Sequence, residues 1–393
     1  MRNTRNSGII IRREIRRRSI MEDRKIRVMS VFGTRPEAIK MCPLVLELQK
    51  NPNIQSIVCL TGQHRQMLDQ VMDVFKIKPD YDLNIMLPRQ TITTITTGVL
   101  SKMEQVFKEC RPEVVLVHGD TTTSMAAALA AFYHQIPVGH VEAGLRTYNK
   151  YSPFPEEMNR TITGRIATYH FAPTERNAQN LKAEGITGHV YITGNTVIDS
   201  FKTTVKRDYH FKAPGLQQID FASKKTILMT AHRRENLGEP LENICRAVKR
   251  VAESFQDIQV IYPVHLNPAV RQTVNSILGN VPRVYLIDPV DVEDMHNLMS
   301  KSHLVMTDSG GLQEEAPSFG VPVLVLRTET ERPEAVAAGT VKVVGVDEET
   351  IYTEAYELLT NTESYERMAK AVNPYGDGHA SERIVRHLLQ DLL

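Results

Sequence analysis

The sequence predicts an α/β fold made of two successive halves, each containing a parallel β-sheet covered by helices. Short apolar runs rich in β-branched residues alternate with helical patterns along the chain, which is typical of parallel sheets. A chain of 393 residues is also longer than the ~250–300 residues that one hydrophobic core normally supports. A polar stretch near residues 206–224 interrupts the alternation once, so we expect one sheet on each side of it.

The first half contains five strand-like runs with helical patterns between them. The strands are expected at Ile26–Phe32, Ser56–Leu60, Glu113–His118, Pro137–Val141 and Tyr169–Ala172. The clearest helical patterns are Ala38–Gln49, Gln66–Phe75 and Thr122–His134. Together these elements predict a first domain over residues 25–200.

The second half repeats the pattern over residues 201–375. Its strands are expected at Thr226–Met229, Val260–Tyr262, Arg283–Leu286, His303–Met306 and Val321–Val325. Ser381–Leu389 is a final helical pattern. We expect the last segment, residues 376–393, to form a helix that packs back on the first domain.

Composition and charge exclude several classes of protein. The hydrophobic content of 41% and charged content of 24% are ordinary for a globular protein, and no apolar run approaches the ~18 residues of a membrane span. Residues 1–20 contain seven Arg and one Glu. Without them the chain keeps 40 of its 47 basic and 45 of its 46 acidic residues, a net charge of −5. This acidic body does not indicate a nucleic-acid partner, and we expect residues 1–24 to be a disordered, functionally neutral extension.

The sequence contains no pattern that calls for a metal or cofactor. The four cysteines lack metal-ligand or redox spacing, which favours a cytoplasmic protein with free thiols. Neither GxGxxG nor GxxxxGK[ST] is present, so a dinucleotide fingerprint and a P-loop are both missing. Asp291-Val-Glu293-Asp294 is similar to the acidic triplet of metal-dependent sugar transferases, but its position favours helix capping.

The first expected strand leads directly into Gly33-Thr34-Arg35-Pro36-Glu37. Proline favours the first turn of a helix, so Arg35 is expected at a helix N-terminus, where an anion is stabilised. Lys40 follows about one turn later. An ordinary strand-to-helix turn would explain the same residues.

Carboxylates follow two successive strands of the first half. Asp120 comes after the strand that ends at His118, and Glu142 comes directly after the next strand. Parallel strands deliver both residues to the same edge of the sheet, where ligands bind in such folds. Glu156 adds a third acidic side chain at an expected helix start. Capping would account for each of the three alone, but not for the coincidence.

The second half carries cations and a glycine turn at its strand ends. His232-Arg233-Arg234 follows the first strand and is suited to binding phosphate. Ser309-Gly310-Gly311 follows another strand and opens a helix, so its backbone N–H groups can approach a diphosphate. Glu315 is placed to accept hydrogen bonds from ribose hydroxyls, and Arg332 adds another cation. These motifs favour a nucleotide site.

Taken together, the motifs resemble those of the non-hydrolysing UDP-N-acetylglucosamine 2-epimerases of bacteria. The most specific pieces are GTRPEAIK, VHGDTTT, HVEAGLRT, PEEMNR, HRREN, TDSGGLQEEA and ERPE. The resemblance runs from Ile26 to the C-terminal helix, nearly the whole chain. It implies two Rossmann-like domains of the GT-B type with the active site in the cleft between them, and a homodimer.

The resemblance also implies a reaction and its residues. UDP-N-acetylglucosamine would be converted reversibly to UDP-N-acetylmannosamine for cell-surface polysaccharide synthesis, through elimination of UDP and its re-addition to a glucal, without a cofactor. Catalytic roles fall on Asp120, Glu142, Glu156 and His232. Substrate contacts fall on Arg35, Lys40, Met295, Ser309, Gly310, Glu315 and Arg332. A second UDP-N-acetylglucosamine, an allosteric activator in some members, would contact Gln63, Gln66, Arg89, Arg233 and His265.

Three other functions are compatible with parts of this pattern. A GT-B sugar transferase shares the architecture but does not need three carboxylates in the first half. A hydrolysing 2-epimerase would differ mainly in how well it retains UDP. A nucleotide-sugar sensor would keep the UDP contacts and would not need Asp120, Glu142 or His232.

Overall fold

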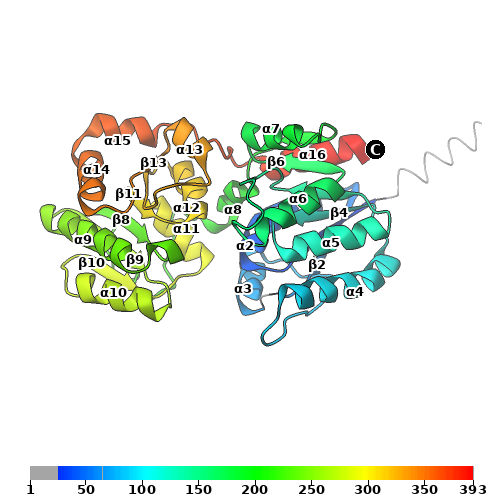
Figure 1. Ribbon diagram of the computed structural model, residues 1–393, viewed down its shortest axis with the longest axis horizontal. Coiled ribbons are helices and arrows are strands. Elements are labelled where there is room, and N and C mark those ends of the chain that lie inside the picture. Colours follow the sequence, from blue (N-terminus) through cyan, green and yellow to red (C-terminus); the bar gives the residue numbers. More distant parts are fainter. Residues whose placement is uncertain (1–24, 64, 393) are drawn as a thin grey trace, which may run out of the picture.

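The computed structural model describes residues 25–63 and 65–392, and it contains two parallel sheets that form two lobes side by side (Figure 1). The expected extension over residues 1–24 lies outside the described residues. The first sheet has seven strands in the order β3-β2-β1-β4-β5-β6-β7, and the second has six in the order β10-β9-β8-β11-β12-β13. The predicted α/β fold with two parallel sheets is therefore confirmed.

The first sheet and its helices span the first lobe. The strands are β1 (Ile26–Phe32), β2 (Ile54–Leu60), β3 (Tyr81–Asp82), β4 (Val114–His118), β5 (Val138–Val141), β6 (Tyr169–Ala172) and β7 (Val190–Ile192). The helices are α2 (Arg35–Lys50), α3 (Gln66–Phe75), α4 (Ile92–Cys110), α5 (Thr122–Tyr133), α6 (Glu156–Ile166), α7 (Glu175–Ala183) and α8 (Thr196–Thr204).

The second lobe begins after residues 205–224, which form no helix or strand. Its strands are β8 (Lys225–Thr230), β9 (Ile258–Pro263), β10 (Val284–Ile287), β11 (Leu304–Thr307), β12 (Val323–Val325) and β13 (Val341–Val343). Its helical elements are η1 (Arg234–Asn236), α9 (Glu239–Ser254), α10 (Pro268–Leu278), α11 (Val292–Ser300), α12 (Gly310–Glu315), η2 (Ala316–Phe319), α13 (Pro333–Ala338), α14 (Glu348–Thr360) and α15 (Thr362–Ala369). The last helix is α16 (Ala380–Leu392).

Each sheet is buried on both faces, which explains why the strands are apolar throughout. Strand β1 sends Val28 and Phe32 into one hydrophobic core and Met29 and Val31 into another. In the second sheet β8 divides its side chains between two cores in the same way. No helix of the described residues is long and apolar enough to cross a membrane.

Helix α2 begins at Arg35, earlier than the expected Ala38, because Thr34 caps it. The Thr34 side chain accepts a hydrogen bond from the N–H of Glu37, whose carboxylate accepts from the N–H of Thr34 in return. This reciprocal capping box stabilises the first turn. A Cβ on Gly33 would lie 1.8 Å from Thr61 Oγ1, so only glycine fits where the strand turns into the helix. Asp291 likewise caps α11, as expected, by accepting from the N–H of Asp294 at 2.8 Å.

The chain passes between the lobes twice, and the two crossings touch. The first runs through Asn195, α8 and residues 205–224 into the second lobe, and the second returns through Tyr375 to α16. The N–H of Asn195 donates to the carbonyl of Tyr375 at 2.7 Å. Helix α16 then packs on α2 and α8 beside the first lobe (Figure 1). Its side chains Ile384 and Leu388 belong to the core of β1 and β4.

Candidate active site

Arg160 holds the carboxylate of Asp120 at the end of the first sheet. Its Nε and Nη2 atoms lie 3.0 and 2.6 Å from Asp120 Oδ2. Asn159 donates to the carbonyl of Asp120 at 2.9 Å. Because both partners come from α6, this helix fixes the turn that follows β4.

Glu142 lies directly after β5 with its backbone in the left-handed region, at φ 60°. Such a conformation is costly for a non-glycine residue and is found preferentially at functional sites. The ammonium of Lys40 contacts the Glu142 carboxylate, and His118 Nε2 lies 2.9 Å from the same oxygen. Burial alone would raise the pKa of Glu142, but the charges of Lys40 and His118 hold it well below its usual range.

The structure distinguishes the two glutamates at the start of α6. Glu157 is buried, accepts hydrogen bonds from the N–H groups of Thr147 and Tyr148 at 3.0 and 2.9 Å, and pairs with Arg160. Glu156 is partly exposed, and its carboxylate forms no hydrogen bond or ion pair within the described residues. Glu157 therefore shapes the loop, whereas Glu156 is available to a ligand.

Asp308 organises the cationic turn after β8. Its Oδ2 atom accepts from the N–H groups of His232 and Arg233 at 2.7 and 2.8 Å and from Asn236 Nδ2 at 3.0 Å. The Asp308 side chain is fully buried, and these donors compensate its charge. Partial burial lowers the pKa of the His232 imidazole, opposed by Asp308.

Two guanidinium groups lie beside the Ser-Gly-Gly turn that opens α12. A Cβ on Gly310 would lie 3.6 Å from Arg332 Nη2 and 3.8 Å from Arg233 Nη2. Ser309 is the N-cap residue of α12, and its side chain makes no capping hydrogen bond. The structure thus brings a hydroxyl, bare backbone and two cations together, a combination suited to a diphosphate.

Glu315 lies next to this turn, with Oε1 3.2 Å from where a Cβ on Gly311 would lie. Glu315 ends α12 with Oε2 3.5 Å from Nε2 of the buried His296. Met295 precedes His296 on α11 and is partly buried in the core that contains Leu298 and Val325. Glu315 is therefore on the helix that the Ser-Gly-Gly turn opens, and Met295 is on the helix that contacts Glu315 through His296.

A buried charge network joins the carboxylate side of the site to the cation side. Lys40 contacts Glu142 and lies 3.9 Å from Glu314 Oε2, and Glu314 contacts Arg332 Nε. Burial works against the charged form of Lys40, but the two carboxylates raise its pKa. Burial also opposes the charge on Arg332, and Glu314 raises its pKa. Four charged groups from both lobes thus meet with two positive and two negative charges.

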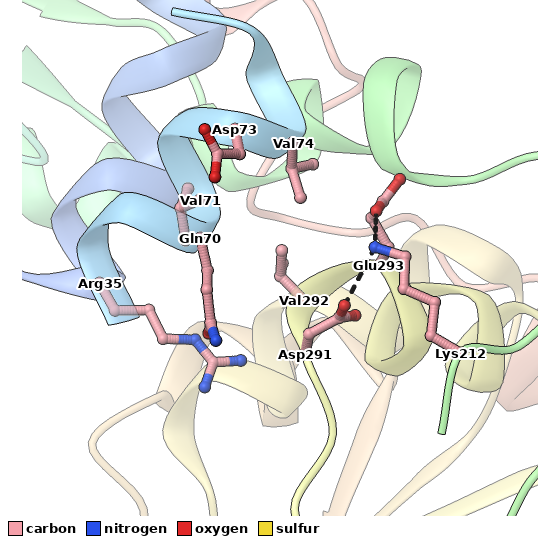
Figure 2. A pocket seen from close by; sticks show the side chains of 9 residues that line it. All are labelled: Arg35, Gln70, Val71, Asp73, Val74, Lys212, Asp291, Val292 and Glu293. Atoms are coloured by element: carbon pink, nitrogen blue, oxygen red, sulfur yellow. Dashed lines mark hydrogen bonds and ion pairs between the residues drawn. The ribbon is translucent and has the colours of Figure 1, made fainter. Parts of the chain in front are cut away.

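Arg35 projects from the start of α2 toward a pocket between the lobes (Figure 2). The pocket has a volume of ≈340 Å³ and is lined by α3 on one side and by the start of α11 on the other. Arg35 Nη2 donates to the carbonyl of Val290 at 3.4 Å. Burial lowers the pKa of Arg35, opposed by Asp291 and Glu315. The other lining residues are Gln70, Val71, Asp73, Val74, Lys212, Asp291, Val292 and Glu293.

The five residues expected to bind an activator come from both lobes. His265 stacks on His232, and Arg233 lies beside Gly310. In the first lobe Gln63 Oε1 accepts from Thr123 Oγ1 at 2.8 Å. Gln66 begins α3, and Arg89 lies in an exposed turn with φ 57°. Arg233 therefore adjoins the Ser-Gly-Gly turn and His265 adjoins His232, while the other three residues lie on the first lobe.

Sequence reasoning missed four residues that hold this site together: His118, Arg160, Asp308 and Glu314. All four lie inside motifs that were singled out for a neighbouring residue. A signal existed for His118, since the last residue of a buried strand is seldom ionisable. For Glu314, only the packing of α12 distinguishes it from Glu315.

Known proteins resemble this chain over nearly its whole length. A family model described as UDP-N-acetylglucosamine 2-epimerase matches residues 46–389. The chain is 59% identical to UDP-N-acetylglucosamine 2-epimerase of Bacillus subtilis, covering 93% of this chain and 96% of that protein. It is 54% identical to the Escherichia coli K12 enzyme of the same name, over 92% of this chain and 98% of that one.

A solved structure of the Neisseria meningitidis enzyme bound to UDP-N-acetylglucosamine superimposes with a TM-score of 0.85 at 52% identity. It covers 93% of this chain and 100% of that one. Identities above one half over nearly the full length of both chains leave the family in no doubt: this chain belongs to the UDP-N-acetylglucosamine 2-epimerase family.

Proposed function

We propose that this chain interconverts UDP-N-acetylglucosamine and UDP-N-acetylmannosamine. The observation that carries the proposal is the buried contact between the lobes: Lys40, which contacts Glu142, lies 3.9 Å from Glu314, and Glu314 contacts Arg332 beside the Ser-Gly-Gly turn. Family membership supports the same reaction, since relatives above 50% identity are named UDP-N-acetylglucosamine 2-epimerase. A sugar diphosphate would lie with its phosphates on the cations and its sugar on the carboxylates.

The chemistry explains why several carboxylates are needed. Carbon 2 of the sugar is not next to a carbonyl, so removing its proton directly is too costly. Elimination avoids this: the carbon 1–oxygen bond to UDP breaks as a base takes the proton from carbon 2, leaving a glucal. Addition of a proton to the opposite face of carbon 2, with return of the UDP oxygen to carbon 1, gives the epimer. Acid–base groups are therefore required near both faces.

The predicted catalytic residues fit these tasks. Lys40 and His118 keep Glu142 ionised, so in the resting site it accepts a proton. Asp120 is held by Arg160, and Glu156 is free to move toward a ligand. His232 and the arginines beside Gly310 would stabilise departing UDP without releasing it. We include Arg35, Lys40, Met295, Ser309, Gly310, Glu315 and Arg332 as substrate contacts.

Three further features belong to the proposal. We infer that a second UDP-N-acetylglucosamine acts as activator through Gln63, Gln66, Arg89, Arg233 and His265. The stacking of His265 on His232 supports communication between this set and the catalytic set. We also propose a homodimer in the cytoplasm, on the resemblance of the sequence to its family.

Proton NMR of the protein with UDP-N-acetylglucosamine in heavy water tests the reaction. The expected result is UDP-N-acetylmannosamine with deuterium at carbon 2 and no free sugar. Free N-acetylmannosamine with UDP would instead identify a hydrolysing enzyme, and an unchanged spectrum at high substrate would contradict the proposal.

Matched variants separate chemistry from folding. Glu142→Gln keeps the shape of the side chain and is expected to reduce kcat by at least ~100-fold, in the range of a lost acid–base group. Asp220→Asn changes a carboxylate in an exposed loop and is expected to leave kcat unaltered. Equal activity in the two variants would exclude Glu142 from the reaction.

A further inference from the structure

Glu314 occupies the point where the two lobes and the two chain crossings meet. Its carboxylate contacts Arg332 Nε on one oxygen. The other oxygen accepts from Asn195 Nδ2 at 2.9 Å and lies 3.9 Å from Lys40 Nζ. The Glu314 side chain is 3% exposed. Sequence reasoning assigned no role to this residue.

The side chain of Glu314 contacts Asn195 of the first crossing, and its backbone contacts Asn373 of the second crossing. Its carbonyl accepts from Asn373 Nδ2 at 2.9 Å. Asn373 in turn accepts from the N–H of Tyr375, whose carbonyl accepts from Asn195. A closed loop of hydrogen bonds therefore passes through Glu314, Asn195, Tyr375 and Asn373. Any rotation of the lobes about the crossings acts on Glu314 directly.

The same carboxylate determines where the Arg332 guanidinium points. Arg332 gives its Nε–H to Glu314, and its outer Nη2 atom lies beside Gly310. A guanidinium is planar, so fixing Nε fixes the direction of the outer nitrogens. Glu314 thereby directs the outer nitrogens of Arg332 toward the Ser-Gly-Gly turn, while Glu314 itself contacts the Nε side of the guanidinium.

We propose that Glu314 is a positioning residue for the epimerisation: it couples the two chain crossings to Arg332 and Lys40 without contacting the nucleotide sugar. This inference rests on the proposed function, because the role it assigns is the retention of UDP during the reaction. When UDP has left carbon 1, Arg332 must hold it close to the glucal. A guanidinium that is no longer aimed would hold UDP out of line with carbon 1, so that re-addition slows and the glucal leaves the site.

The charge of the network predicts that the affinity for UDP does not fall when Glu314 loses its charge. Lys40 and Arg332 are partly neutralised by Glu314 and Glu142. Glu314→Gln removes one negative charge from a buried site, so the two cations attract the diphosphate at least as strongly as before. The variant is therefore expected to bind UDP no more weakly while turning over more slowly.

The test compares wild type, Glu314→Gln, Glu314→Asp and a control, Glu184→Gln. Glu184 is 16% exposed and pairs with the buried Arg146 at 2.6 Å in the first lobe, so its loss measures the cost of breaking a buried pair elsewhere. Each protein is assayed with UDP-N-acetylglucosamine for kcat, KM, and release of free UDP and glucal. Thermal unfolding and the stoichiometry of UDP binding give the fraction of folded sites.

For Glu314→Gln we expect kcat per folded site to fall at least ~10-fold, KM not to rise, and glucal and UDP to accumulate. Glu314→Asp keeps the charge and is expected to recover part of kcat. The control should show lower thermal stability with normal kcat per folded site and no glucal. A Glu314→Gln protein that behaves like the control would overturn the inference. Absence of epimerisation by wild type would instead contradict the proposed function.

Discussion

The imidazole rings of His232 and His265 lie parallel, with centroids 5.1 Å apart and planes inclined by only 6°. One residue was predicted to be catalytic and the other to contact an activator. Burial lowers the pKa of His232, opposed by Asp308, and the neighbouring His265 lowers it further. The stack therefore links the protonation of a predicted catalytic residue to a residue of the expected second site.

His265→Ala is expected to raise the pKa of His232. Removing the neighbouring ring, which lowers the pKa of His232, and admitting water both favour the charged imidazolium of His232. If the charged form of His232 stabilises departing UDP, the alkaline limb of the kcat/KM profile moves to higher pH. Histidine proton NMR, with His232→Asn to assign the resonance, measures the pKa directly. A lowered or unchanged His232 pKa would rule out this coupling; His210→Ala, at an exposed position, serves as the control.

Lys40→Met is expected to move the acid limb of the activity profile to higher pH. Lys40 is the strongest charge that lowers the pKa of Glu142. Without it, Glu142 holds its proton to higher pH, so the ionised form required as a base is lost earlier as the pH falls. Removing one partner of a buried pair also costs about 3–5 kcal/mol of stability.

Lys50→Met is the matched control for this variant, since Lys50 lies on the same helix with a 71% exposed side chain and pairs with Glu47. Exposed pairs contribute roughly 0–1 kcal/mol. Measurement of kcat against pH and of urea unfolding should separate the two lysines. Identical acid limbs in wild type and Lys40→Met would show that Lys40 does not control Glu142.

The sequence predicted the two sheets and the strand-end residues because both depend on local pattern. Asp120 and Glu142 could be found since any parallel sheet brings its carboxyl strand ends to one edge. Glu314 could not be told from Glu315, because their different directions arise from how α12 packs between the lobes. Helix α4 was not predicted, because its four threonines lower helix propensity, although Ile95, Val99 and Met103 form a buried stripe.

Short elements and long-range contacts account for the remaining omissions. Strands β3, β7 and β13 have two or three residues each, too few for an alternating pattern to be recognised. The bond between Asn195 and Tyr375 joins residues far apart in the chain. Such a pairing follows from the path of the chain between the lobes and leaves no local signal.

Stability is expected to fall as the pH drops below 6.5, and His140 is one cause. Burial lowers the pKa of this fully buried histidine to about 3, whereas in the unfolded chain it is near its ordinary 6.5. Between these values the unfolded state binds the extra proton, so acid favours unfolding by about 1.4 kcal/mol per pH unit. Above pH 6.5 the histidine is neutral in both states and has no effect.

His140→Gln should make this pH dependence shallower. The glutamine amide can replace the ring Nε2–H that bonds the carbonyl of Gly119 at 2.7 Å, and it does not titrate. Urea unfolding at pH 7, 6 and 5 gives the slope, with His210→Gln at an exposed position as the control. Equal slopes in His140→Gln and wild type would show that His140 takes up its proton without unfolding.

In two buried tyrosines, loss of the hydroxyl is expected to change the free energy of unfolding in opposite directions. The Tyr375 hydroxyl has no hydrogen-bond partner among residues 25–63 and 65–392, although the residue is only 3% exposed. The Tyr262 hydroxyl, in a fully buried residue, donates to the carbonyl of Ala231 at 2.6 Å. An unpaired buried polar group costs roughly 1–3 kcal/mol, while a satisfied hydrogen bond contributes about 1 kcal/mol.

Tyr375→Phe should therefore raise the free energy of unfolding by about 1 kcal/mol, and Tyr262→Phe should lower it by a similar amount. Urea unfolding of both variants at neutral pH measures the two changes. Destabilisation by Tyr375→Phe would mean that its hydroxyl, beside Glu142 and Arg332, is hydrogen-bonded in solution.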